Sequence, residues 1–249
     1  RFVILGPDNW VGGLTYKWNE AGTDATLLET GDSQAFTVID KEGNPFNQIW
    51  DFPSRGQCIT CHNTNAKSVL GLKTHQLNGD LTYPVTGITD NQLRTWNSLG
   101  MFVNGPLEST IPNLPKSVPI DDPDASLDLK VSSYLDANCS HCHRPGGVIT
   151  SFDARFQSEL DKLIYAPTQS TASTEGSQIV IPGDALHSML RIRDAAVEEG
   201  AMPPLARNIV DQVYIDTLTA WINSLNPDDY EIPCTEPTID RLVWVNSDT

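Results

Sequence analysis

Two five-residue runs of the sequence have the residue types and the spacing that covalent haem attachment requires. They read Cys58-Ile59-Thr60-Cys61-His62 and Cys139-Ser140-His141-Cys142-His143. In a Cys-x-x-Cys-His run the two thiols add to the two vinyl groups of one porphyrin, and the histidine binds the iron axially. The sequence therefore predicts two haems c as cofactors. The predicted attachment residues are Cys58, Cys61, Cys139 and Cys142, and the predicted axial iron ligands are His62 and His143.

The trailing histidine argues against other uses of a Cys-x-x-Cys pair. A thioredoxin-like dithiol does not need histidine at the next position, and a zinc site needs further ligands nearby. A disulfide within either pair would close a very short loop. The two runs use four of the five cysteines in the chain. The fifth, Cys234, is interpreted as a free thiol or as the disulfide partner of another chain or of a removed segment.

Composition and charge restrict the class of partner. The chain has 249 residues, enough for two small domains, and its 32 acidic against 16 basic residues give a net charge of −16. Nucleic acid is excluded as a partner because phosphate binding needs the opposite charge. No run approaches the roughly 18 apolar residues of a membrane span. The expected partners are redox proteins, for which basic surfaces would be complementary.

The predicted cofactor also bears on the cellular compartment. Haem c is attached outside the bacterial cytoplasm, so we expect a periplasmic or extracellular protein whose precursor carried an export signal. The sequence starts with Arg1 rather than Met, and Arg1–Leu5 has the pattern of a strand with no turn residue before it. We therefore expect a further segment upstream in the precursor.

The first half of the chain predicts strands and then short helices. Residues 1–52 form a β-rich segment in which apolar and polar residues alternate between Gly, Asn and Asp turns. Its expected strands are Arg1–Leu5, Leu14–Trp18, Ala25–Glu29 and Ala35–Asp40. Residues 53–105 form a first haem module, with a helix over Thr89–Leu99 that Asp90 caps and Gly100 ends. Residues 106–125 are proline-rich, which predicts an extended linker.

The second half predicts a helical module over residues 126–226 and a tail over 227–249. An amphipathic helix should run from about Ser126 into Cys139, and Ala166–Gly176 should be a polar surface loop. Asp184 should cap a short helix that extends to about Arg193, and Asp211 should cap the last helix. The predicted fold class is α+β, with a β-rich N-terminal segment followed by two mainly α-helical, cytochrome c-like haem modules.

The order of elements in residues 126–226 resembles a class I cytochrome c. The matching features are a helix leading into Cys-x-x-Cys-His, the turn Met202-Pro203-Pro204, and a final helix that carries Trp221. The resemblance implies that Met202 is the sixth ligand of the second haem iron, opposite His143. A thioether is a soft, neutral ligand that favours reduced iron. Met189 and His187 are interpreted as packing and surface residues.

The first haem has two candidate sixth ligands. Met101 follows the helix that ends at Gly100, where a loop could turn its side chain onto iron. His75 is the alternative, and bis-histidine ligation would give a lower potential than His/Met ligation. The sequence favours Met101 slightly, and an open sixth position stays a third alternative.

Much of the chain resembles a poorly characterised family of bacterial di-haem c-type cytochromes. The resembling stretches are residues 16–25, 53–58, 73–78 and 134–139. The resemblance implies exported electron transfer and assigns no substrate. Three hypotheses follow: an electron carrier between redox partners, which we favour; a di-haem peroxidase; and a subunit of a haem-bearing assembly that associates through the N-terminal strands or Cys234.

Overall fold

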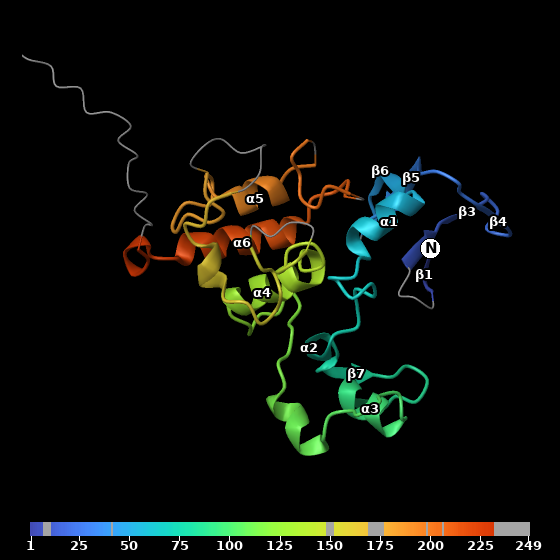
Figure 1. Ribbon diagram of the computed structural model, residues 1–249, viewed down its shortest axis with the longest axis horizontal. Coiled ribbons are helices and arrows are strands. Elements are labelled where there is room, and N and C mark those ends of the chain that lie inside the picture. Colours follow the sequence, from blue (N-terminus) through green and yellow to red (C-terminus); the bar gives the residue numbers. More distant parts are fainter. Residues whose placement is uncertain are drawn as a thin grey trace, which may run out of the picture.

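The computed structural model describes residues 1–6, 11–40, 42–147, 152–168, 177–197, 199–205 and 207–231. Antiparallel hairpins form the N-terminal part, and most helices follow it in the chain, so the predicted α+β class is confirmed. Figure 1 shows the hairpins beside a body that contains α4, α5 and α6, with α2 and α3 in a smaller part below. Within the described ranges no helix is long and apolar enough to cross a bilayer.

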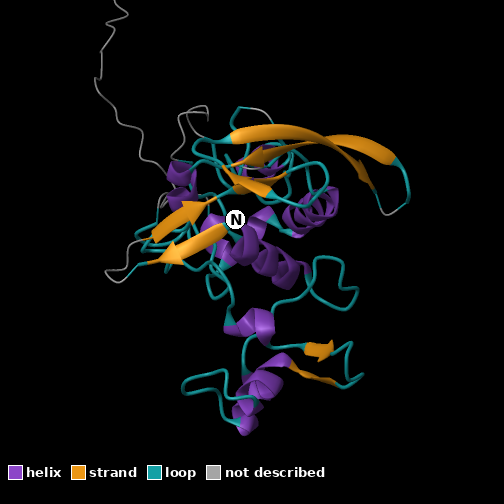
Figure 2. Ribbon diagram, turned by 90° about the vertical axis from the view of Figure 1, so that its right-hand side faces the viewer, coloured by secondary structure: helices purple, strands orange, loops and turns teal. Residues whose placement is uncertain are grey.

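The strands pair as separate two-stranded antiparallel ribbons. The pairs are β1 (Phe2–Leu5) with β2 (Val11–Leu14), β3 (Tyr16–Trp18) with β4 (Ala25–Leu27), β5 (Asp32–Ile39) with β6 (Pro45–Phe52), and β7 (Asp80–Thr82) with β8 (Thr89–Asn91). Figure 2 shows β5 and β6 as the longest of these ribbons. Gly43 has a φ of +90° in their turn, a conformation that glycine adopts without steric cost. The β-rich character predicted for residues 1–52 is confirmed, and the four predicted strands overlap β1, β3, β4 and β5, but β6 was not predicted.

The prediction for residues 89–99 was wrong at its N-terminal end. Helix α3 spans Gln92–Ser98, because Asn91 is its N-cap and accepts a hydrogen bond from the Leu93 amide at 2.9 Å. Thr89–Asn91 belong to β8 instead. Asp90 bonds to the Arg94 guanidinium and to the Asn91 amide, so its carboxylate is not available as a cap. Gly100 ends the helix as predicted, with a φ of +68°.

The proline-rich segment is not extended throughout, and this part of the prediction was wrong. Residues Glu108–Asn113 form a 3₁₀ helix, η1, which contains Pro112. Proline fixes φ near −65°, a value that a 3₁₀ helix also uses. Ile111 is 1% exposed and packs with Leu77 and Leu93 in a small apolar cluster. Burial of this one side chain favours the compact conformation.

The main core lies between α4 (Leu127–Asn138) and α6 (Gln212–Ser224). Ser126 and Asp211 are the N-caps of these helices, which confirms both predicted starts. Trp221 of α6 is buried, and its indole Nε1 donates to Asp128 of α4 at 2.9 Å. The remaining helical segments are α1 (Arg55–Cys61), α2 (Thr74–Leu77), η2 (Leu160–Leu163), α5 (Met189–Asp194) and η3 (Pro227–Asp229).

Helix α5 starts later than predicted. Ser188 occupies its N-cap position, whereas the Asp184 carboxylate accepts from the ring of His187 at 2.6 Å and from the His187 amide at 3.2 Å. Asp184 thus stabilises the turn before the helix, so its assignment as the cap was wrong. Most of the predicted loop Ala166–Gly176, and Cys234 in the tail, lie outside the described residues.

Loss of a core leucine should show how much the contact between α4 and α6 stabilises the fold. Leu218→Ala should lower the free energy of unfolding by about 2–5 kcal/mol, because a fully buried leucine leaves a cavity when it is truncated. The matched control is Leu186→Ala at a side chain 69% exposed, where we expect a change within about 0.5 kcal/mol. Urea unfolding followed by circular dichroism measures both. Equal effects would contradict the placement of the core.

Candidate functional site

The first Cys-x-x-Cys-His run occupies α1 and its C-terminal end. Ser54 and Gln57 form a capping box, with the Ser54 amide donating to the Gln57 side chain at 2.9 Å. Cys58 and Cys61 are three residues apart on this helix, so both sulfurs lie on neighbouring turns of one face. The cap therefore fixes the start of the helix that presents the two thiols.

The orientation of His62 leaves one ring nitrogen available to bind a metal. Nδ1 lies 2.7 Å from the backbone oxygen of Ser68. Because a carbonyl oxygen only accepts hydrogen bonds, Nδ1 is the donor in this contact, and Nε2 is the nitrogen that can take a metal. Metal-binding histidines commonly have this arrangement, in which the second nitrogen holds the ring in place.

Strand β2 approaches the first run so closely that only glycine fits at one position. A Cβ added to Gly13 would lie 2.3 Å from the Cys58 sulfur and 2.6 Å from its Cβ. Any larger residue would displace Cys58 or the strand. The N-terminal hairpin β1–β2 is thereby part of the surroundings of the first run.

The second run begins where α4 ends. Cys139 is the C-cap residue of α4, and its amide donates to the Leu135 carbonyl at 2.8 Å. The His143 ring stacks on Phe152 with 4.2 Å between ring centroids, and its buried Nδ1 has no hydrogen-bond partner among the described residues. Burial lowers the pKa of His143 to about 4. The imidazole is therefore neutral near pH 7, the form that ligates a metal.

A cavity of about 390 Å³ lies beside the second run. Its lining brings Met202 together with Cys139 and Cys142, although Met202 lies 60 positions after Cys142 in the sequence. Tyr134 and Tyr214 line it as a stacked pair, with 3.6 Å between their ring centroids. Apolar contributions to the lining also come from Pro203, Pro204, Leu205 and Ile209. A concave, largely apolar site with a few polar groups is typical of cofactor binding.

Hydrogen bonds to backbone carbonyls fix the loop that carries Met202. The Met202 amide donates to the Arg193 carbonyl at 3.0 Å, and the Arg207 guanidinium donates to the carbonyls of Met202 and Asp194. Asp194 also lines the cavity and accepts from the Tyr214 hydroxyl at 2.8 Å. Burial raises the pKa of Asp194 to about 6, and the Tyr214 hydrogen bond opposes this rise. Met202 thus lines the cavity from a loop that these hydrogen bonds hold, and its role as a ligand stays a prediction.

The two runs meet at their second cysteines. The sulfurs of Cys61 and Cys142 and a ring nitrogen of His141 all lie within 4.8 Å of one another. Hydrogen bonds from Cys142 and then from His141 hold the pKa of the Cys61 thiol well below its usual range, while the same contact with Cys61 raises the pKa of Cys142. The sequence gives no signal for this meeting, because a contact between distant segments has no local pattern. In the sequence His141 was visible only as one of the two residues between the cysteines of its run.

The structure places the two candidate sixth ligands of the first site away from the cavity described above. Met101 is 59% exposed and lines a different cavity, with Trp96 and Phe102, to which no residue of the first run contributes. His75 Nε2 donates to the Asp136 carboxylate at 2.8 Å, and the His75 ring stacks on Phe156 with 4.5 Å between centroids. Both assignments stay predictions.

The structure agrees with the interpretation of Met189 and His187 as a packing residue and a surface residue. The His187 side chain is 75% exposed and pairs with Asp184. Met189 is half-buried at the start of α5 and does not belong to the lining of the cavity that contains Met202. Of the methionines, Met202 alone lines that cavity.

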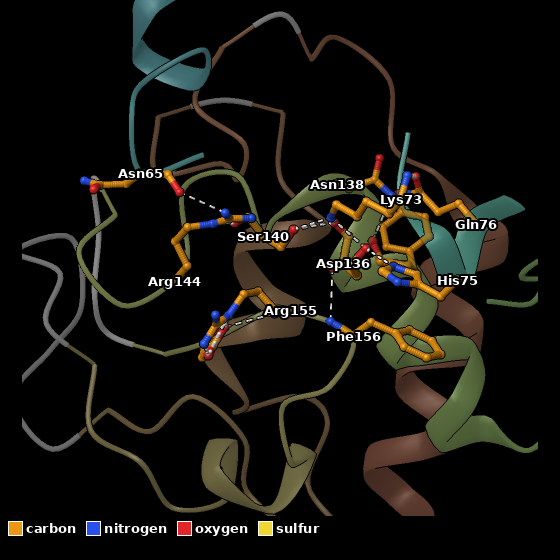
Figure 3. A network of polar contacts seen from close by, with 12 residues as sticks. Asn65, Lys73, His75, Gln76, Asp136, Asn138, Ser140, Arg144, Arg155 and Phe156 are labelled. Atoms are coloured by element: carbon orange, nitrogen blue, oxygen red, sulfur yellow. Dashed lines mark hydrogen bonds and ion pairs between the residues drawn. The ribbon is translucent and has the colours of Figure 1, made fainter. Parts of the chain in front are cut away.

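A polar network, drawn in Figure 3, surrounds Asp136 on the last turn of α4. The Lys73 ammonium donates to Asp136 Oδ2 at 2.7 Å and to the Ser140 hydroxyl at 2.8 Å, and the Phe156 amide donates to Asp136 Oδ1 at 3.0 Å. Burial opposes ionisation of this carboxyl, but the bonds from Lys73 and His75 outweigh it and hold its pKa below the usual range. Sequence reasoning missed this network.

Comparison of the chain with models of known protein families, with curated protein sequences and with solved structures finds no match. The functional interpretation therefore depends on the residues of the site themselves.

Proposed function

We propose that this chain is an exported di-haem c-type cytochrome that transfers electrons between redox partners. The observation that carries the proposal is the cavity in which Cys139 and Cys142 of one Cys-x-x-Cys-His run face the same space as Met202. Two attachment sulfurs and a soft thioether at one apolar cavity are the groups that a haem c of the class I type needs.

The chemistry of both runs fits this cofactor, although His143 itself is not among the residues that line the cavity. At the first run, Nδ1 of His62 is occupied by the Ser68 carbonyl, which leaves Nε2 for iron. At the second, the ring of His143 is neutral near pH 7 and is held against Phe152. The aromatic wall of Tyr134 and Tyr214 suits a flat, apolar ring system.

When bound, haem c supplies a one-electron couple between ferric and ferrous iron. The protein's part is to hold that group and to tune its preference. Cys139 and Cys142 would anchor it, His143 and Met202 would bind its iron, and the apolar lining would exclude water. Exclusion of water disfavours the more highly charged ferric state, and a thioether ligand does the same.

The finer features of the fold and the cell biology belong to the same proposal. We assign residues 53–105 and 126–226 to two cytochrome c-like modules, and we place the protein in the periplasm or outside the cell. Its net charge of −16 favours redox partners with basic surfaces, because opposite charges accelerate association.

Oxidation kinetics distinguish an electron carrier from the peroxidase alternative. We expect the fully reduced holoprotein to be oxidised quickly by a small soluble electron acceptor and only slowly by hydrogen peroxide, since an iron with two protein ligands has no vacant position. Stopped-flow absorbance measures both reactions on one sample. Sustained peroxide consumption by the wild-type protein would instead support a peroxidase whose reactive iron has an open sixth position, the third alternative for the first haem.

A second candidate is a metal centre formed by Cys61, His141 and Cys142. Their ligand atoms lie within 4.8 Å of one another, and two thiolates with one imidazole are a common zinc ligand set. This centre and two haems exclude each other, because both would use the same two sulfurs. Elemental analysis of the protein purified with its native metal content distinguishes the two. Two iron atoms per chain would support the haems, and stoichiometric zinc would support the metal centre.

A further inference from the structure

The place where the two Cys-x-x-Cys-His runs meet has a consequence for electron movement within the chain. Cys61 and Cys142 each provide the second attachment sulfur of their run, and the two sulfurs and the His141 ring lie within 4.8 Å of one another. Cys61 and His141 also line the cavity that contains Met202. Two residues of the first run, Thr60 and Cys61, therefore reach the space that the second run uses.

Contacts next to the two runs hold this meeting in place. Asn65, three residues after His62, donates through its side chain to the Gly146 carbonyl, and its own carbonyl accepts from Arg144 at 3.0 Å. Arg144 and Gly146 directly follow the second run. Figure 3 shows Asn65 and Arg144 close together. The segments that follow both runs are thus bonded to each other.

An ion pair provides a second, independent connection. Lys73 belongs to the segment after the first run, and its ammonium bonds to the Asp136 carboxylate at 2.7 Å and to Ser140 inside the second run at 2.8 Å. The Asp136 side chain is 3% exposed and that of Lys73 is 23% exposed. Removing one partner of such a pair leaves a buried charge without compensation, which is strongly destabilising for the contact. We therefore expect this ion pair to hold the segment after the first run in a fixed position relative to the second run.

We propose that Cys61, Cys142 and His141 form the junction through which the two haem sites exchange electrons directly, with Lys73 and Asp136 as the positioning residues. This inference rests on the proposed function. Electronic coupling falls steeply with distance and is stronger through bonds than through space, so two attachment sulfurs in close proximity give a short path. In each exchange one iron loses an electron and the other gains it, and no bond or proton changes place.

Circular dichroism in the Soret region of the reduced holoprotein tests whether the two chromophores are close. Two neighbouring haems should give a bisignate signal, whereas two distant haems should give the sum of two single-signed signals. A single-signed spectrum from protein with two haems per chain would overturn the junction and leave the proposed function intact. Fewer than two haems per chain, counted on the same sample, would overturn both.

A variant with a matched control tests the positioning residues. Lys73→Met should abolish most of the bisignate amplitude at an unchanged count of two haems, because the second run loses its buried partner. Lys162→Met removes a lysine whose side chain is 74% exposed in a surface pair with Glu159, and it should leave the signal unchanged. Full amplitude in Lys73→Met would show that Lys73 does not position the junction. If this variant folds poorly, the bisignate signal of the wild-type protein still tests whether the junction exists.

Nuclear magnetic resonance of half-reduced protein measures the exchange itself. Fast exchange within the chain should make the haem methyl signals shift continuously through a reductive titration, with line widths independent of protein concentration. Separate signals for each intermediate oxidation state would mean slow exchange and would contradict a direct path. His141→Ala keeps both sulfurs and should broaden the signals if the imidazole contributes to the path; unchanged signals would restrict the junction to the two sulfurs.

Discussion

Expression of the chain together with a haem c maturation system should give two covalently bound haems per polypeptide. Both runs contain the two thiols and the axial histidine that attachment requires. The double variant Cys139→Ser with Cys142→Ser should retain one haem, because the first run is intact. Pyridine haemochrome spectra calibrated by protein mass, together with intact mass spectrometry, count the haems.

The fifth cysteine supplies the control for that experiment. Cys234→Ser changes the thiol that lies in neither run, and it should leave two haems per chain. One haem in the wild-type protein, or two in the double variant, would contradict the assignment of attachment residues. Stoichiometric zinc in place of haem would favour the centre at Cys61, His141 and Cys142.

Met202→Ala should abolish the methionine-to-ferric-iron charge-transfer band of the second haem and lower its potential. Loss of the thioether removes a ligand that favours ferrous iron. A tenfold loss of that preference corresponds to about 59 mV for a one-electron couple, and we expect a fall of at least about this size. Near-infrared absorbance and a spectroelectrochemical titration measure the two effects.

The other methionines make the experiment specific. Met189→Ala alters a half-buried side chain on α5 outside the cavity, and it should change neither the band nor the potential. Met101→Ala should affect only the first haem if Met101 is its ligand. An unchanged band in Met202→Ala would refute the predicted ligation. Loss of the band in Met189→Ala instead would identify Met189, not Met202, as the ligand.

The local sequence was sufficient for the elements whose signals are local. The N-terminal hairpins, the helix that begins after Ser126 and the helix that begins after Asp211 follow from alternation, helical spacing and capping side chains. The helix starts were predicted wrongly where two nearby residues compete for the N-cap position. Asp90 and Asp184 both have the side chain of a cap, but each bonds to a neighbour instead, and Asn91 and Ser188 occupy the cap positions.

The same division applies to the proline-rich segment. Prolines restrict φ without choosing between extended and 3₁₀ backbone, because both use values near −65°. Burial of Ile111 against Leu77 and Leu93 selects the 3₁₀ helix. Ile111 lies 34 positions after Leu77 and 18 after Leu93, and no short window of the sequence displays these contacts.

For the site, the sequence by itself determined the chemistry of each Cys-x-x-Cys-His run, since thiols and imidazole within five residues need no tertiary contact to be recognised. Only the tertiary structure decided which distant residues share a space with them. It brought Met202 to the cavity of Cys139 and Cys142, placed Cys61 beside Cys142, and directed His75 to Asp136. These contacts form when whole segments pack against one another. The free energy that stabilises them comes from many side chains, so no single sequence motif reveals them.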